Sequence, residues 1–157
     1  MTQDLFRITV DEPNYGQLLA SPPTDTLFDK ANFSTQQGAR LWAQKSNEKG
    51  QKLYDTMKPG DGLLFYKVKR GIADDEQLYV GVGRVGEKHR LTEAQAETFF
   101  RTSVATLAYT VTDFQPIRKP VKEIETILGY SSYPQSSHRV VDNRYNTIDE
   151  VLQKLSQ

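Results

Sequence analysis

Trp42, the single tryptophan of the chain, is the residue whose side chain and setting most clearly suggest chemistry. It lies in a polar neighbourhood, just before a predicted helix, in the run LWAQKSNEKGQKLYD. A large flat ring there can act as a stacking platform, because every nucleobase has a π face and stacking is worth ~1–3 kcal/mol. The alternative is that Trp42 fills the core beneath a sheet. On the platform interpretation, Trp42→Ala should remove binding and leave the fold intact.

Other side chains could complete a pocket around a base that stacks on Trp42. The loop DEPNYG offers polar groups for the edge of the base, in Asn14 and Asp11, and Asn47 is a third candidate. The alternative for Asn14 is an ordinary turn residue. Further walls would come from aromatic residues, for each of which core packing is the competing interpretation: Tyr15, Phe99, Phe100, Tyr130 and Tyr133.

Basic residues near these positions could contact the phosphates of a nucleic acid. The densest basic run is GRVGEKHR, and SSHRV places Ser137, His138 and Arg139 together in a predicted loop. Such contacts position a protein on nucleic acid, although a charged run is more often a solvated surface. The candidates for phosphate binding are Lys45, Lys49, Arg84, Lys88, Arg90 and Arg139, followed by His89 and Arg144.

Composition limits the class of protein. Twenty Lys and Arg residues balance twenty Asp and Glu residues, so affinity for nucleic acid must come from a local pocket rather than from overall charge. The absence of cysteine excludes disulfides, thiolate nucleophiles and cysteine zinc sites. We expect no metal and no cofactor, because the two histidines lack ligand spacing. Without a signal peptide or an apolar run of membrane-spanning length, a cytoplasmic protein is expected.

The elements that position these residues follow from hydrophobic periodicity and turn signals. A single domain of 157 residues is predicted. The first strand should have one buried face, and the second and third strands should pair as a hairpin. Gly81 and Gly83 suggest that the third strand bends or lets another group approach closely. The predicted strands are Leu5–Val10, Leu63–Val68, Leu78–Val85, Val104–Pro116 and Arg139–Val141.

Helices are predicted between these strands. Asn47 or Ser46 should cap the first, Thr92 should begin the second with a capping box, and Thr147 should cap the last. The sum is an α/β (α+β) fold, a small bent or barrel-like mixed sheet of about five or six strands with three or four peripheral helices. The predicted helices run from Asn47 or Glu48 to Met57, over Thr92–Thr102, within Arg118–Gly129 and over Thr147–Leu155.

The run from Leu41 to Asp55 resembles the segment of YTH domains in which a cage tryptophan is followed by Asn-Glu-Lys and a helix. Trp42, Asn47, Glu48 and Lys49 are the matching positions. The following KPGDGLLFYKV and LYVGVGRV resemble the related EVE domains, in which a Gly-Asp turn precedes an apolar strand ending in Tyr and a Gly-Val-Gly strand. Both families are PUA-like, and the resemblance extends in patches from the first strand to Pro116.

YTH domains hold a flipped N6-methyladenine in an aromatic cage, and EVE domains are described as readers of modified bases in DNA. The chain is also similar to the YTH-like module at the N-terminus of archaeal McrB-type restriction GTPases. The resemblance therefore implies a PUA-like fold and a flipped N6-methyladenine in DNA stacked on Trp42. It also implies a fused or associated restriction GTPase or nuclease as a partner. Modified RNA is the alternative ligand.

Two other functions compete with base reading. An ASCH-type, metal-independent ribonuclease of the same broad fold would need a Lys or Tyr near a phosphate, such as Lys67 or Tyr66. The stretch Ser136 to Asp142 contains the residue types of a hydrolase triad, but in one short loop, whereas triad members normally come from separate elements. We therefore expect a protein that is not an enzyme. The third function is protein interaction without nucleic acid.

Overall fold

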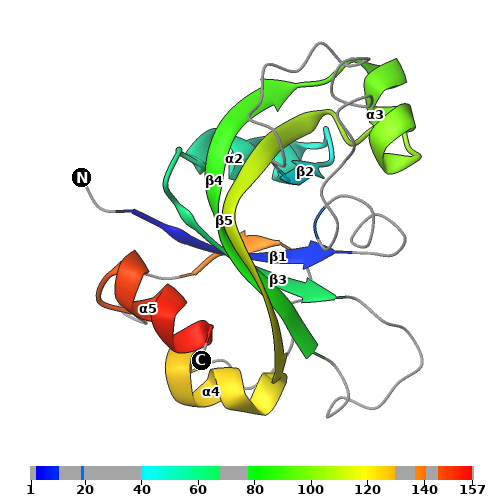
Figure 1. The fold of residues 1–157 in the computed structure, drawn as a ribbon. Coiled ribbons are helices and arrows are strands. Elements are labelled where there is room, and N and C mark those ends of the chain that lie inside the picture. Colours follow the sequence, from blue (N-terminus) through cyan, green and yellow to red (C-terminus); the bar gives the residue numbers. More distant parts are fainter. Residues whose placement is uncertain are drawn as a thin grey trace. The chain divides into compact units, whose positions relative to one another are not determined.

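A computed structural model describes residues 3–10, 19, 40–67, 78–129, 137–140 and 145–156 (Figure 1). The described strands form a mixed sheet in the order β2-β5-β4-β3-β1-β6, with four helices in the same ranges. This confirms the predicted α+β class and the predicted number of elements. The elements are β1 (Leu5–Val10), β2 (Arg40–Gln44), α2 (Glu48–Thr56), β3 (Gly62–Lys67), β4 (Leu78–Arg90), α3 (Glu93–Phe100), β5 (Leu107–Pro120), α4 (Val121–Leu128), β6 (His138–Arg139) and α5 (Ile148–Leu155).

Two compact units divide the chain. The terminal unit comprises Met1–Glu12, Gly60–Arg84 and Asp113–Gln157, and the central unit comprises Pro13–Pro59 and Val85–Thr112. The long strands β4 and β5 each contribute one part to each unit. The prediction of a single domain stays a prediction.

In the terminal unit, β1 pairs in parallel with β3 and antiparallel with β6. The predicted one-sided burial of β1 is wrong, since Leu5, Phe6 and Ile8 are fully buried and Arg7 is only 3% exposed. A strand that lies between two neighbours and is covered on both faces buries successive side chains. The local alternation in the sequence does not reveal this second cover.

The predicted hairpin of β3 and β4 is confirmed by an antiparallel register that pairs Leu63 with Gly83 and Phe65 with Gly81. Gly81 also fulfils the expectation of a close approach. A Cβ atom at this position would lie 2.6 Å from a ring carbon of Phe114. The group that approaches the glycine is therefore an aromatic side chain of the same unit, rather than a second backbone.

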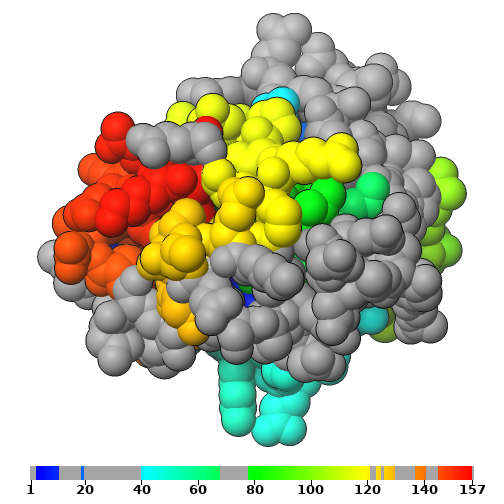
Figure 2. Space-filling model, turned by 90° about the horizontal axis from the view of Figure 1, so that it is seen from below, coloured from blue at the N-terminus to red at the C-terminus, as the bar shows by residue number. Residues whose placement is uncertain are grey.

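Helices α4 and α5 cover the core of the terminal unit and lie side by side on the face shown in Figure 2. Thr147 caps α5 as predicted, with its side chain accepting from the backbone N–H of Glu150. Of the predicted apolar face of α5, Ile148, Val151 and Leu155 are buried. The core cluster that these helices share with the strands consists of Leu5, Leu64, Tyr66, Tyr79, Val82, Ile124, Leu128, Val140, Ile148, Val151 and Leu155.

Two boundaries in the terminal unit differ from prediction. The predicted helix around Arg118 begins later, because β5 continues to Pro120. A residue before proline is held in the extended region, which keeps Lys119 in the strand. The last strand is shifted, since β6 is His138–Arg139, Val140 follows it, and Val141 lies outside the described residues.

In the central unit, β2 was not predicted as a strand. It pairs antiparallel with β5, with Trp42 opposite Tyr109. The helices were predicted correctly: Asn47 caps α2, and Thr92 and Gln95 form the capping box of α3. Among the helices of the described ranges, none has the length and apolar character needed to cross a membrane.

Candidate nucleic-acid interface

Trp42 lies in the middle of β2, in the central unit, and only 4% of its surface is exposed. Phe100, at the end of α3, meets its ring edge-on, with ring centroids 5.7 Å apart and planes at 88°. In the free protein, Trp42 is thus a core residue, as in the alternative interpretation, and not an open platform before a helix. A base can stack on this ring only after a group that covers it moves away.

Of the predicted second walls that lie in the described part of the chain, Phe100 has a ring contact with Trp42. Phe99 is buried in the same helix, at 2% exposure. The other predicted walls and the base-edge residues of the first loop lie outside the described residues, and their roles stay predictions: Asp11, Asn14, Tyr15, Tyr130 and Tyr133.

Asn47 is exposed, and its side-chain oxygen accepts from the backbone N–H of Gly50 at 2.7 Å. This bond caps α2, which supplies a structural reason for the residue beside its predicted contact with a base. Gly50 itself is required by the tight entry to the helix, because a Cβ atom there would lie 1.9 Å from the carbonyl oxygen of Lys45.

Lys88 interacts with the protein's own backbone. Its Nζ donates to the carbonyl oxygens of Tyr54 at 2.8 Å and Met57 at 3.1 Å, at the C-terminal end of α2. A cation is favourable there because the helix dipole concentrates negative charge at that end. The same Nζ lies 4.6 Å from the centroid of the Tyr54 ring. These contacts oppose the predicted role of Lys88 as a phosphate ligand.

Three predicted phosphate ligands of the central unit have exposed side chains: Lys45, Lys49 and Arg90. Lys45 and Lys49 flank the N-terminal end of α2, and the Arg90 guanidinium lies 5.8 Å from the Tyr54 ring. Burial raises the pKa of the Tyr54 phenol, an effect that Arg90 partly offsets and Asp55 reinforces. The central unit therefore presents positive charge around α2.

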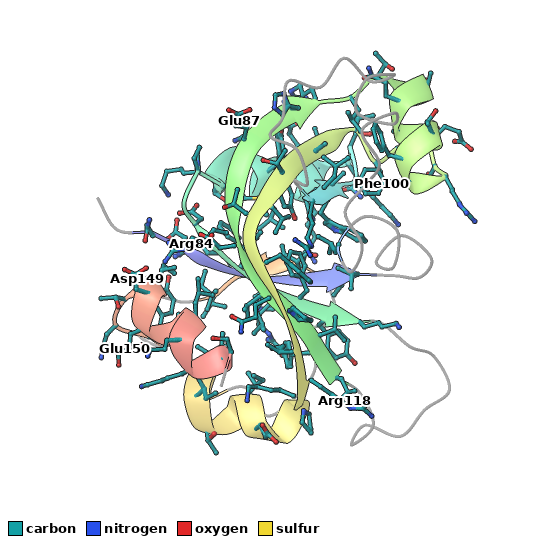
Figure 3. The ribbon with its side chains drawn as sticks, viewed as in Figure 1. Arg84, Glu87, Phe100, Arg118, Asp149 and Glu150 are labelled. Atoms are coloured by element: carbon teal, nitrogen blue, oxygen red, sulfur yellow. The ribbon has the colours of Figure 1, made fainter. Side chains whose placement is uncertain are left out.

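The remaining predicted phosphate ligands lie in the terminal unit, where both have acidic partners. Arg84, labelled with Asp149 in Figure 3, bonds to this carboxylate of α5 and donates to the carbonyl oxygen of Gly60 at 2.9 Å. Arg139 lies 3.5 Å from Asp4 and is 41% exposed at its side chain. The predicted set is thus divided between the two units. His89 pairs with Glu87, and Arg144 lies outside the described residues.

A buried cationic cluster in the terminal unit was not predicted. The Arg7 guanidinium donates to the Tyr79 hydroxyl from Nε at 3.0 Å and from Nη2 at 2.6 Å, and its Nη1 lies 3.3 Å from Nε2 of His138. Ser137 accepts from the backbone N–H of Thr9 at 3.0 Å. Ser137 and His138, from the segment that suggested a phosphate clamp or triad, therefore attach β6 to β1.

A polar pair beside Trp42 was also missed. Gln44 follows Trp42 by two residues in β2, and its Oε1 accepts from the Tyr109 hydroxyl at 3.2 Å. Burial raises the pKa of Tyr109 well above its usual value, so this phenol stays a protonated donor. If the run LWAQ had been interpreted as a strand, Trp42 and Gln44 would have been placed on one face of it, and Gln44 would have become a candidate for contact with the base.

The comparisons with known proteins agree with this fold. A family model described as the EVE domain matches residues 18–138. The chain is similar to human THYN1 in complex with DNA that contains 5-methylcytosine, with 10% identity, a TM-score of 0.52 and 99% coverage of both chains. A protein from Agrobacterium tumefaciens is 14% identical, with a TM-score of 0.52 and coverage of 96% of this chain and 92% of the other.

An ASCH mutant protein from Zymomonas mobilis is 8% identical, with a TM-score of 0.50 and coverage of 98% of this chain and 99% of the other. No curated protein matches the sequence. At these identities the solved structures show a shared fold, whereas the family model covers well over half of the chain. The protein therefore belongs to the EVE domain family of the PUA-like superfamily.

Proposed function

We propose that the protein binds nucleic acid carrying a modified base, and that the flipped base enters beside Trp42. The observation that carries this proposal is the pairing of Trp42 with Phe100 in a chain of the EVE family. A methyl group adds little hydrogen bonding, so an aromatic pocket must recognise it by burial, at ~0.8 kcal/mol per group. The 5-methylcytosine DNA bound by the structural neighbour THYN1 supports the same ligand class.

The favoured ligand is N6-methyladenine in DNA, because the spacing from Trp42 to Lys49 resembles that of YTH domains. 5-Methylcytosine is the competing ligand, supported by the THYN1 complex. Modified RNA is the alternative polymer. Lys45, Lys49 and Arg90 would contact the backbone, since they are exposed in the same unit as Trp42.

In the cell, the protein would serve a modification-dependent restriction system. It would act in the cytoplasm as a targeting module without catalytic activity of its own. A fused or associated GTPase or nuclease would then cleave the DNA that the module selects. This proposal rests on the resemblance to the N-terminal modules of McrB-type proteins. Affinity purification of the protein from its source cells would test it, because a GTPase or nuclease should co-purify.

The binding experiment uses fluorescently labelled DNA and RNA of one sequence, unmodified or with a single N6-methyladenine or 5-methylcytosine. We expect about fourfold tighter binding to one modified strand, the equivalent of the ~0.8 kcal/mol gained by burying the methyl group. Trp42→Phe, which retains an aromatic core side chain, should lower this preference while circular dichroism reports an intact fold. Equal affinity for all modified and plain strands would contradict the proposal.

A metal-independent ribonuclease is the second candidate function. The cluster of Arg7, Tyr79 and His138 in the terminal unit favours it, because a guanidinium and an imidazole can act on a phosphodiester. The predicted Tyr66 is 1% exposed, and its ring packs against that of Tyr79, with Lys67 next in β3. Incubation of labelled RNA with chelator decides between the candidates, because cleavage that is lost in His138→Gln or Lys67→Gln would indicate an enzyme.

A further inference from the structure

Strand β2 places Gln44 on the same face as Trp42, because side chains two residues apart in a strand point the same way. The strand pairs Trp42 with Tyr109 and Gln44 with Leu107, so Tyr109 is the diagonal neighbour of Gln44 on that face. All of these residues belong to the central unit. A base beside Trp42 would therefore meet Gln44.

The Gln44 amide has a fixed orientation. Its side chain is 8% exposed, and its Oε1 is the acceptor of the hydrogen bond that the fully buried Tyr109 hydroxyl donates. Reversing the amide would bring an N–H₂ group to the hydroxyl and leave the phenol proton without this acceptor. The oxygen thus faces Tyr109, and the nitrogen faces away from it.

The nitrogen of that amide can donate hydrogen bonds, and it faces away from Tyr109. Nε2 of Gln44 makes no hydrogen bond within the described ranges of the chain, and it is not among the fully buried atoms there that lack a partner, so it reaches solvent although nine-tenths of the residue is buried. A ligand that presents an acceptor beside Trp42 would take the place of water at this donor.

We propose that Gln44 selects the base by donating from Nε2 to a ring nitrogen on its Watson–Crick edge. Adenine and cytosine both present an acceptor ring nitrogen beside their exocyclic amino group, whereas guanine and thymine present a ring N–H there. A fixed donor therefore accepts modified adenine or cytosine and repels the other two bases. This inference rests on the proposed function. Within that function, the aromatic rings recognise the methyl group, and Gln44 recognises the base.

Gln44→Glu is the primary variant, because it keeps the oxygen that accepts from Tyr109 and replaces the amide donor by a second oxygen. We expect binding to the preferred modified strand to weaken by about tenfold or more, the usual effect of losing a buried hydrogen bond. Gln153→Glu is the matched control, since it makes the same change at an exposed position of α5. It should bind as the wild type does.

A second design covers the case in which Gln44→Glu fails to fold. Gln44→Met with Tyr109→Phe removes both polar partners together and retains their volume, which a core tolerates better than an orphaned group. The probe is a modified strand in which a C–H replaces the acceptor ring nitrogen. This replacement should weaken wild-type binding by about tenfold and should not change the binding of the double variant.

The outcomes separate this inference from the function on which it rests. If the wild type prefers a modified strand but tolerates the C–H replacement, or if Gln44→Glu binds normally, the role of Gln44 is wrong and the proposed function stands. If the wild type prefers no modified strand, both are wrong. Weakened binding of both Gln44 variants, with normal binding of Gln153→Glu, supports both.

Discussion

The two units use their polar groups differently. In the terminal unit, the basic side chains Arg7, Arg84 and Arg139 bind partners in the same unit, which joins β1, β4, β6 and α5. In the central unit, Lys45 and Arg90 are exposed, and the buried Gln44 amide has a fixed orientation beside Trp42. The difference indicates that these polar interactions of the terminal unit mainly hold the fold together, and it is the reason why we propose the central unit as the part that binds a ligand.

The largest expected effect is on the central unit. Trp42→Ala removes a side chain that is 96% buried and should lower the free energy of unfolding by ~3–5 kcal/mol. Denaturant titration measures this change. The expectation from sequence, that this variant would leave the fold intact, does not suit a buried ring, and for this reason Trp42→Phe is the better test of binding. A Trp42→Ala protein of wild-type stability would show that the ring is exposed in solution.

High pH should also destabilise the central unit. Burial raises the pKa of Tyr109 in the folded state above the unfolded value of 10.0, so the folded protein holds its proton more tightly. Stability is therefore fully present below pH 10 and falls as the pH rises above it, by up to ~1.4 kcal/mol per pH unit for one such group. Unfolding titrations across this range should show a smaller fall for Tyr109→Phe. An equal fall in both proteins would assign the effect to other tyrosines.

Gly50→Ala tests the entry to α2. Alanine is normally the better helix former by about 1 kcal/mol, but its Cβ would collide with the Lys45 carbonyl oxygen. We expect a net loss of ~1–3 kcal/mol, as for other overpacked sites, measured by thermal unfolding. An increase in stability would mean that the backbone at Lys45 can move aside at little cost.

The smallest expected effects compare exposed charges of the two units. Asp149→Asn removes the partner of Arg84, but the carboxylate is 88% exposed, so the loss of stability should stay within ~0.2–1 kcal/mol. Nucleic-acid affinity should not change.

Replacing Lys45 and Arg90 by Gln should leave stability nearly constant and reduce the salt dependence of binding. If Asp149→Asn changed the nucleic-acid affinity and the replacement of Lys45 and Arg90 did not change its salt dependence, the phosphate contacts would lie in the terminal unit.

The sequence was sufficient for those parts of the fold that local interactions determine. Capping by Asn47, Thr92 and Thr147 identified three helices, because the side chain and the backbone N–H that it accepts from lie within one turn. Strand β2 was missed because it is short, lies at the sheet edge and depends on pairing with β5, far along the chain. Pairing of this kind has no local signature.

In the candidate site, too, residue types could be predicted from the sequence, whereas contacts that depend on tertiary packing could not. The importance of Trp42 and Phe100 could be predicted from residue type, but their edge-on contact and their burial depend on tertiary packing. Lys88 looks like any surface cation in the sequence, and only the fold brings it to the end of α2. Arg7 appeared to be the polar member of an alternating strand, although β6 and Tyr79 enclose it.

The position of Lys88 has a consequence for chemical labelling. In acylation the lone pair of an amine nitrogen attacks the reagent, and the part-buried position of the Lys88 nitrogen against the carbonyls of Tyr54 and Met57 restricts the approach of the reagent. Lys45 is exposed and should be acylated at the ordinary rate. The ratio of the two rates, read by mass spectrometry, would therefore report whether the C-terminal end of α2 remains in place while a ligand enters or leaves.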